Sequence, residues 1–123
     1  RIYEIPAGGS SAVGALGYTR CLAELMVQCR NRNIGTDLIV HASASAGTQA
    51  GLVFGKSLLG MPGQILGINV FHPDPQTLKD RILTLAQTMS ERWPESSDSA
   101  MLPPPLGRRA VGAPCREILD PRR

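Results

Sequence analysis

Aromatic residues are scarce in this sequence, making up 4% of its 123 residues. One Trp, two Tyr and two Phe cannot supply the aromatic platforms on which proteins stack single-stranded nucleic acids. Glycines, prolines and charged residues interrupt every hydrophobic segment, so no run approaches the roughly 20 apolar residues that a membrane-spanning helix needs. These absences argue against a nucleic-acid partner and against a membrane protein.

Cysteine is also rare, and the three cysteines are Cys21, Cys29 and Cys115. An odd number without a Cys-x-x-Cys spacing provides neither a disulfide framework nor a zinc site. We therefore expect no bound metal and a cytoplasmic protein. The net charge is only +3, and five of the eleven arginines lie within residues 108–123. This is a local concentration of charge and not a nucleic-acid-binding face.

The composition that remains suits one globular domain, because 42% of the residues are hydrophobic and 19% are charged. Six of the ten prolines lie within residues 94–123, together with serines and arginines and almost no hydrophobic periodicity. We expect a folded domain over residues 1–93, and a linker, a disordered tail or a non-native reading frame over residues 94–123. Because the chain begins at Arg1 within a strand-like run, we expect it to be a fragment of a longer protein.

Strands and helices are predicted to alternate along residues 1–93. Short β-branched or apolar runs bounded by turn residues predict three strands, over residues 2–6, 37–43 and 64–70. The last two are continuously apolar, which is typical of parallel strands buried on both faces. Apolar residues at helical spacing predict helices over residues 12–30 and 48–59, and a third that ends near Trp93. This β-α-β-α-β-α order predicts an α/β fold, a three-layer parallel sheet with helices packed against it.

Two loops of small residues lie where a predicted strand leads into a helix. We name them the 8–10 turn (Gly8, Gly9 and Ser10) and the 44–48 loop (Ala44, Ser45, Ala46, Gly47 and Thr48). Ligands of open parallel sheets bind at such positions, beyond the carboxyl ends of the strands. Free N–H groups at a helix N-terminus favour an anion such as phosphate, and the Ser45 and Thr48 hydroxyls can donate further hydrogen bonds. The alternative is that small residues merely allow close packing.

Other sites are less well supported by the sequence. No lysine follows either loop, which excludes a Walker loop, and the 8–10 turn lacks the G-x-G-x-x-G pattern of a dinucleotide-binding module. Ser45, His41 and Asp74 could form a Ser-His-Asp triad, but no G-x-S-x-G elbow accompanies them. We expect His41 to be a hydrogen-bonded core residue, and we assign His72 and Asp74 to the turn before the third helix.

The two loops also carry a family resemblance. Residues 3–25, 38–60 and 64–70 resemble the D-cysteine desulfhydrase and 1-aminocyclopropane-1-carboxylate deaminase family through the motifs IPxGGS…GxxGY and SxSAGTxAG. The resemblance covers residues 1–93. It implies a tryptophan-synthase-β-like fold of type II, the cofactor pyridoxal 5'-phosphate, a small amino-acid substrate and a homodimeric parent enzyme. The parent reaction would convert D-cysteine to pyruvate, hydrogen sulfide and ammonia, or be a related deamination.

The resemblance further implies that the 44–48 loop holds the cofactor phosphate and that the 8–10 turn lies beside the same cleft. Two features depart from the family. Ser11 stands where family members usually have Asn, and the lysine that holds the cofactor as a Schiff base belongs to a segment preceding the matched residues. The two lysines present, Lys56 and Lys79, are expected at the surface. We therefore predict no catalytic residue and no activity of this chain alone. The alternative is an inactive truncated or pseudogene product that binds anions weakly.

Overall fold

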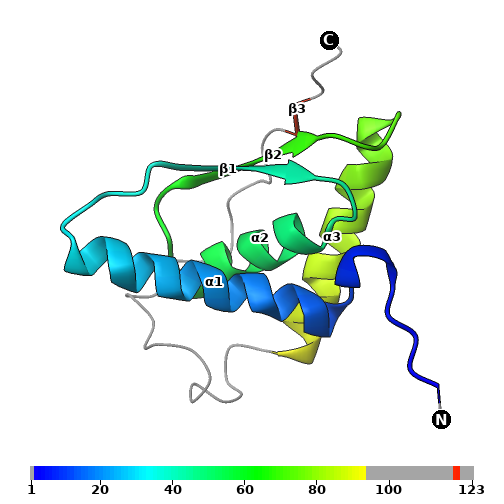
Figure 1. Ribbon diagram of the computed structural model, residues 1–123, viewed down its shortest axis with the longest axis horizontal. Coiled ribbons are helices and arrows are strands. Elements are labelled where there is room, and N and C mark those ends of the chain that lie inside the picture. The colour runs from blue at the N-terminus through cyan, green and yellow to red at the C-terminus, as the bar shows by residue number, and fades with distance from the viewer. Residues whose placement is uncertain (1, 94–117, 120–123) are drawn as a thin grey trace.

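The computed structural model describes residues 2–93 and 118–119 of the chain (Figure 1). Along the chain, the elements are the 3-10 turn η1 (Ala7–Gly9), α1 (Ala12–Asn31), β1 (Leu38–Ser43), α2 (Gly47–Leu59), β2 (Gln64–Asn69), α3 (Pro75–Arg92) and β3 (Ile118–Leu119). The three helices and the two longer strands confirm the elements predicted from hydrophobic periodicity. None of the helices in the described part of the chain is long and apolar enough to cross a membrane.

The strand predicted over residues 2–6 is not formed. This segment has no regular secondary structure and joins no strand of the described sheet. Ile2, Tyr3 and Ile5 are 97%, 80% and 73% exposed. Their β-branched and aromatic side chains favour an extended backbone, but a strand also needs a neighbouring strand to accept its hydrogen bonds. Within residues 2–93 the order is therefore α-β-α-β-α.

The sheet is parallel, as the alternation of strands and helices predicts. β1 pairs with β2 in a register that joins Leu38 to Gln64 and Ser43 to Asn69. β3 pairs with the other edge of β2, opposite Gly67 and Ile68. β3 lies within the predicted tail, whereas residues 94–117 and 120–123 lie outside the described residues, and the prediction for them stays a prediction.

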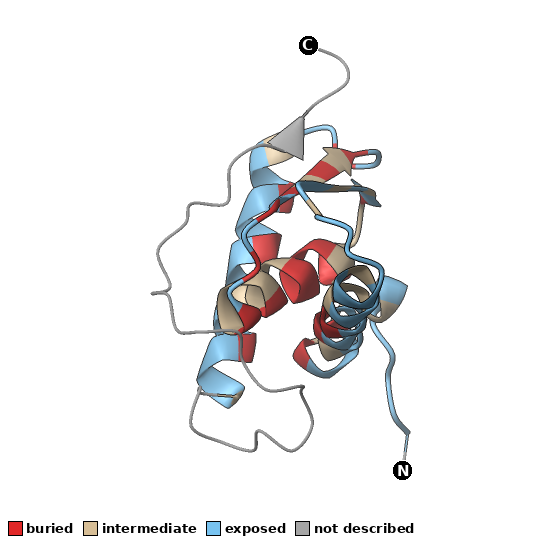
Figure 2. Ribbon diagram, turned by 90° about the vertical axis from the view of Figure 1, so that its left-hand side faces the viewer, coloured by how far each residue is buried: buried red, intermediate tan, exposed pale blue. Residues whose placement is uncertain are grey.

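α1 and α2 lie on one side of the sheet, and α3 runs past the carboxyl ends of its strands (Figures 1 and 2). Exposure consequently alternates along β1, with Leu38 and Val40 49% and 54% exposed on the open side. The prediction that this strand is buried on both faces is wrong for that reason. Its uninterrupted apolar sequence makes both faces apolar, but the described helices cover only one of them. The described residues form two layers of an α/β fold, and the three-layer arrangement remains a prediction.

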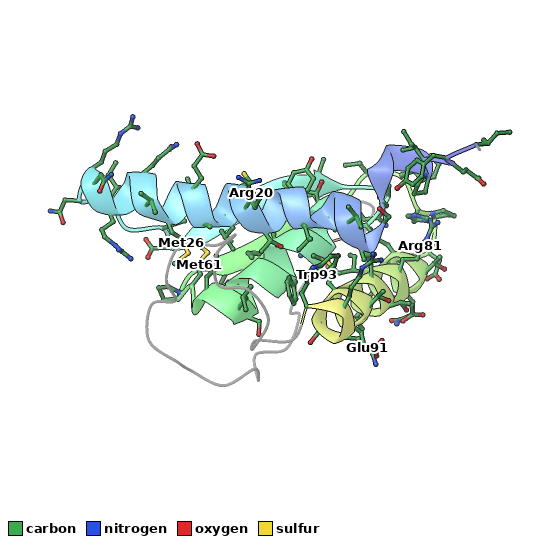
Figure 3. The ribbon with its side chains drawn as sticks, turned by 90° about the horizontal axis from the view of Figure 1, so that it is seen from below. Arg20, Met26, Met61, Arg81, Glu91 and Trp93 are labelled. Carbon is green, nitrogen blue, oxygen red and sulfur yellow. The ribbon has the colours of Figure 1, made fainter. Side chains whose placement is uncertain are left out.

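The core lies between the helices and the inner face of the sheet (Figure 2). The largest cluster joins α1, α2 and β2, and contains the buried residues Leu22, Ala23, Leu52, Leu59, Met61 and Ile65. Met26 packs against this cluster, beside Met61 (Figure 3). Burial of such apolar side chains supplies most of the free energy that holds α1 and α2 under the sheet.

α1 and α2 approach each other closely at Gly51. A Cβ atom at that position would lie 2.1 Å from the Ala15 carbonyl oxygen, so only glycine permits this contact. Beside it, the buried Thr19 hydroxyl donates a hydrogen bond to the Gly51 carbonyl at 2.9 Å. The contact lies near the N-terminal halves of both helices, and it therefore holds the 8–10 turn beside the 44–48 loop.

Candidate functional site

A cleft of about 590 Å³ opens at the carboxyl edge of the sheet. Its walls come from the N-terminal segment, the 44–48 loop, the turn after β2 and one side of α3. The lining includes the apolar side chains Phe71 and Leu85 as well as several polar ones. Pockets that bind small molecules typically have this size, with a mostly apolar lining and a few polar groups.

Four of the eight predicted site residues line this cleft, namely Ser10, Ala44, Ser45 and Ala46. The other four, Gly8, Gly9, Gly47 and Thr48, do not line it. Two of these glycines instead join the loops to each other. The Gly47 amide donates a hydrogen bond to Ser10 Oγ at 3.2 Å, and a Cβ on Gly8 would lie 2.2 Å from Ser45 Oγ. The structure thus brings together the two loops that the sequence singles out.

The 44–48 loop turns into α2 through Ala46, whose φ of 77° is left-handed. Such a residue is uncommon outside glycine, and it redirects successive main-chain N–H groups as in anion-binding nests. The amides of Ser45, Ala46 and Thr48 have no hydrogen-bond acceptor among the described residues. Together with the N-terminal end of α2, they form a group of donors that favours an anion.

The turn after β2 supplies His72, which packs against this loop. The buried Asn69 side chain accepts hydrogen bonds from the Phe71 and His72 amides at 3.2 and 3.0 Å, and it donates one to the His72 carbonyl at 2.8 Å. With its backbone fixed in this way, His72 places Nε2 3.0 Å from the Ala44 carbonyl oxygen. His72 is only 9% exposed, so its ring forms part of the cleft wall.

His72 was predicted only as a turn residue, and its place in the cleft wall was missed. A signal was present, because the residues that follow two adjacent parallel strands meet at one edge of the sheet. Asp74 does cap α3, as the turn predicts. The Thr77 hydroxyl and the amides of Gln76 and Thr77 donate to its carboxylate and lower the pKa of Asp74.

α3 adds two charged residues to the cleft, Asp80 and Arg81. The Asp80 carboxylate accepts a hydrogen bond from the Gln76 side-chain nitrogen Nε2 at 2.7 Å. One terminal nitrogen of Arg81 lies 3.3 Å from His72 Nε2. The sequence offered no signal for Arg81, because its place in the cleft depends on how α3 packs against α2.

Several other candidate residues lie away from the cleft lining. His41 contacts the buried Gln49 side chain and the Ala42 carbonyl oxygen, the latter at 2.9 Å, which confirms that it is hydrogen-bonded. It therefore does not form a triad with Ser45. His41 is half-buried, so the prediction that it belongs to the core is wrong. Lys56 and Lys79 do not line the cleft. Within the described ranges, no group of three or more His, Cys, Asp or Glu residues could hold a metal ion.

Comparison with known proteins identifies curated proteins that are similar to this chain in sequence. It is 43% identical over 70 residues to a D-cysteine desulfhydrase of Serratia proteamaculans (strain 568), a match that covers 57% of this chain and 21% of the relative. It is 39% identical over 90 residues to a D-cysteine desulfhydrase of Salmonella paratyphi C (strain RKS4594), covering 73% and 27%. No family model matches the chain.

A third relative carries the other family name. The chain is 36% identical over 89 residues to the "Putative 1-aminocyclopropane-1-carboxylate deaminase" of Pyrococcus abyssi (strain GE5 / Orsay), covering 72% of this chain and 27% of that protein. The chain thus spans between 21% and 27% of the length of these curated relatives.

Proposed function

This chain belongs to the family of D-cysteine desulfhydrases and 1-aminocyclopropane-1-carboxylate deaminases, and on that premise we propose that it forms the phosphate-binding part of a pyridoxal-phosphate-dependent lyase. The parent reaction converts a small amino acid, D-cysteine in the first instance, to pyruvate, hydrogen sulfide and ammonia. A related deamination of another small amino acid is the second reaction that we consider within the same family. The contact between the 8–10 turn and the 44–48 loop at the cleft is the observation that supports this proposal most directly.

The cleft offers donors of the kind that a phosphate dianion requires. The amides of Ser45 and Ala46 and the Ser45 hydroxyl, which belong to residues that line the cleft, would bind the phosphate oxygens, while the Ser10 hydroxyl accepts from the Gly47 amide and fixes the loop. Charge-assisted hydrogen bonds of this type are roughly twice as strong as neutral ones. When bound, pyridoxal phosphate serves as an electron sink for the carbanion that forms at the substrate's α-carbon.

The chain by itself is expected to bind the cofactor without turning over D-cysteine. Covalent attachment of pyridoxal phosphate and removal of the substrate's α-proton require a lysine amine. Lys56 and Lys79 are the only lysines in the sequence, and neither lines the cleft. The competing proposal is a catalytically inactive product that binds anions only weakly. The two proposals differ in whether the pyridoxal ring adds affinity to that of the phosphate.

Titration of the full chain with three ligands tests the proposed function. We expect pyridoxal 5'-phosphate to bind more tightly than inorganic phosphate, and pyridoxal without its phosphate to bind much more weakly than either. Ser45→Ala should weaken binding of the phosphate-bearing ligands about tenfold, because it removes one hydrogen bond to a charged group. Ser90→Ala is the matched control, since Ser90 is exposed on α3 and does not line the cleft.

Three results would count against the proposal. Equal affinity for pyridoxal 5'-phosphate and inorganic phosphate would favour the weak anion binder. Equal affinity for pyridoxal with and without its phosphate would remove the role of the 44–48 loop. Release of hydrogen sulfide from D-cysteine by this chain alone would contradict the expectation drawn from the positions of its two lysines.

A further inference from the structure

We propose that Arg81 is a phosphate-binding residue of this cleft and supplies the cation that the 44–48 loop lacks. The inference rests on the proposed function, because it assigns an additional ligand to the same anion. The loop itself provides only main-chain amides and hydroxyls, whereas Arg81 reaches the cleft from α3. Figure 3 shows Arg81 on the side of α3 that faces the N-terminal segment.

The position of Arg81 relative to the loop follows from two distances that share one atom. His72 Nε2 lies 3.0 Å from the Ala44 carbonyl oxygen and 3.3 Å from a terminal nitrogen of Arg81. The guanidinium group is therefore separated from the first residue of the loop by a single ring nitrogen. Arg81 is also the one Lys or Arg among the residues that line the cleft, so it is the cation that an anion held by the loop amides would meet there.

The chemistry of the shared nitrogen leaves the guanidinium N–H groups available. A single ring nitrogen cannot donate to a carbonyl oxygen and accept from a guanidinium at the same time. The Ala44 carbonyl belongs to the fixed main chain, whereas Arg81 is exposed and adjusts easily. We accordingly assign the proton to His72 Nε2, which donates to Ala44. Arg81 then keeps its donors for another acceptor in the cleft.

No carboxylate competes for Arg81 in the described part of the chain. Asp80 lies next to it and lines the same cleft, but its carboxylate accepts from Gln76 and forms no ion pair with Arg81. The planar guanidinium fork matches two phosphate oxygens at once. Arg81 thus attracts an anion and Asp80 repels it. Removing the charge of one or of the other should therefore change the affinity for phosphate in opposite directions.

The test is calorimetric titration of the full 123-residue chain with inorganic phosphate and with pyridoxal 5'-phosphate. Arg81→Gln should weaken both affinities about tenfold, and Arg81→Lys should weaken them less because the charge remains. Asp80→Asn should strengthen both by about threefold at low salt, and added salt should reduce that gain. Arg20→Gln is the matched control, since it removes the same charge from α1, away from the cleft lining (Figure 3).

Each outcome decides the proposal. Equal phosphate affinity of Arg81→Gln and the unaltered chain overturns it, as does an equal loss in Arg20→Gln, which would mean that net charge alone matters. If Arg81→Gln does not fold, as judged by circular dichroism, weaker binding by Asp80→Asn overturns it. Failure of the unaltered chain to bind either ligand overturns this inference and the proposed function together. Binding by the unaltered chain that Arg81→Gln leaves unchanged overturns this inference alone.

Discussion

The contact between α1 and α2 at Gly51 predicts that Gly51→Ala destabilises the protein. Alanine favours the interior of a helix by about 1 kcal/mol over glycine. The added Cβ would, however, lie 2.1 Å from the Ala15 carbonyl oxygen and 2.8 Å from Tyr18 Cβ. A main-chain carbonyl cannot rotate away as a side chain can, so α1 has to move. Overpacking of this kind costs about 1–3 kcal/mol.

Movement of α1 also breaks the buried hydrogen bond from Thr19 to the Gly51 carbonyl, which contributes about 1 kcal/mol. The net expectation for Gly51→Ala is a free energy of unfolding lowered by about 2 kcal/mol. In a domain of this size, that corresponds to a melting temperature lower by about 10 °C. The same shift separates the 8–10 turn from the 44–48 loop, so phosphate binding should weaken in parallel.

Gly17→Ala is the matched control, because Gly17 lies within α1, is exposed, and has no atom within 4 Å of the position that a Cβ would occupy. It gains the same helix propensity without the overlap, so the melting temperature should rise by about 4 °C or more. Thermal and urea unfolding followed by circular dichroism measure both variants. If Gly51→Ala is as stable as Gly17→Ala, the close contact between α1 and α2 is refuted.

Two further predictions concern polar groups near the carboxyl edge of the sheet. Ser43 Oγ is buried without a hydrogen-bond partner in the described structure. Because Ser43→Ala removes this unsatisfied hydroxyl, it should raise the free energy of unfolding by about 1 kcal/mol in urea titrations. A lower free energy of unfolding would show that the hydroxyl has a partner. Asp74 has a pKa lowered from the ordinary 3.8, so its carboxylate stabilises α3 above pH 3.8 and loses that effect progressively as the pH falls from 3.8 through the lower pKa of the folded state. Asp74→Ala should therefore melt lower than the unaltered chain at pH 7, and this difference in melting temperature should shrink as the pH falls below 3.8.

Local patterns in the sequence determined most of the secondary structure. The spacing of apolar residues predicted α1, α2 and α3 and the strands β1 and β2, because helical and strand periodicity depend only on neighbours along the chain. The same patterns placed small residues at the starts of α1 and α2. The parallel pairing of β1 with β2 followed from the intervening helix.

Long-range contacts decided which predicted strands form, which face of the sheet is covered and which residues line the cleft. Residues 2–6 have a strand-like composition but no strand partner, and a partner is a property of the tertiary structure. The open face of β1 reflects which side the helices cover, and its apolar sequence is the same on both sides. His72 and Arg81 meet beside the 44–48 loop only because β2 and α3 pack against α2. The sequence by itself determined the three helices, β1, β2 and the two small-residue loops. Packing between distant segments decided which side chains enclose the cleft, because that depends on contacts that no local pattern records.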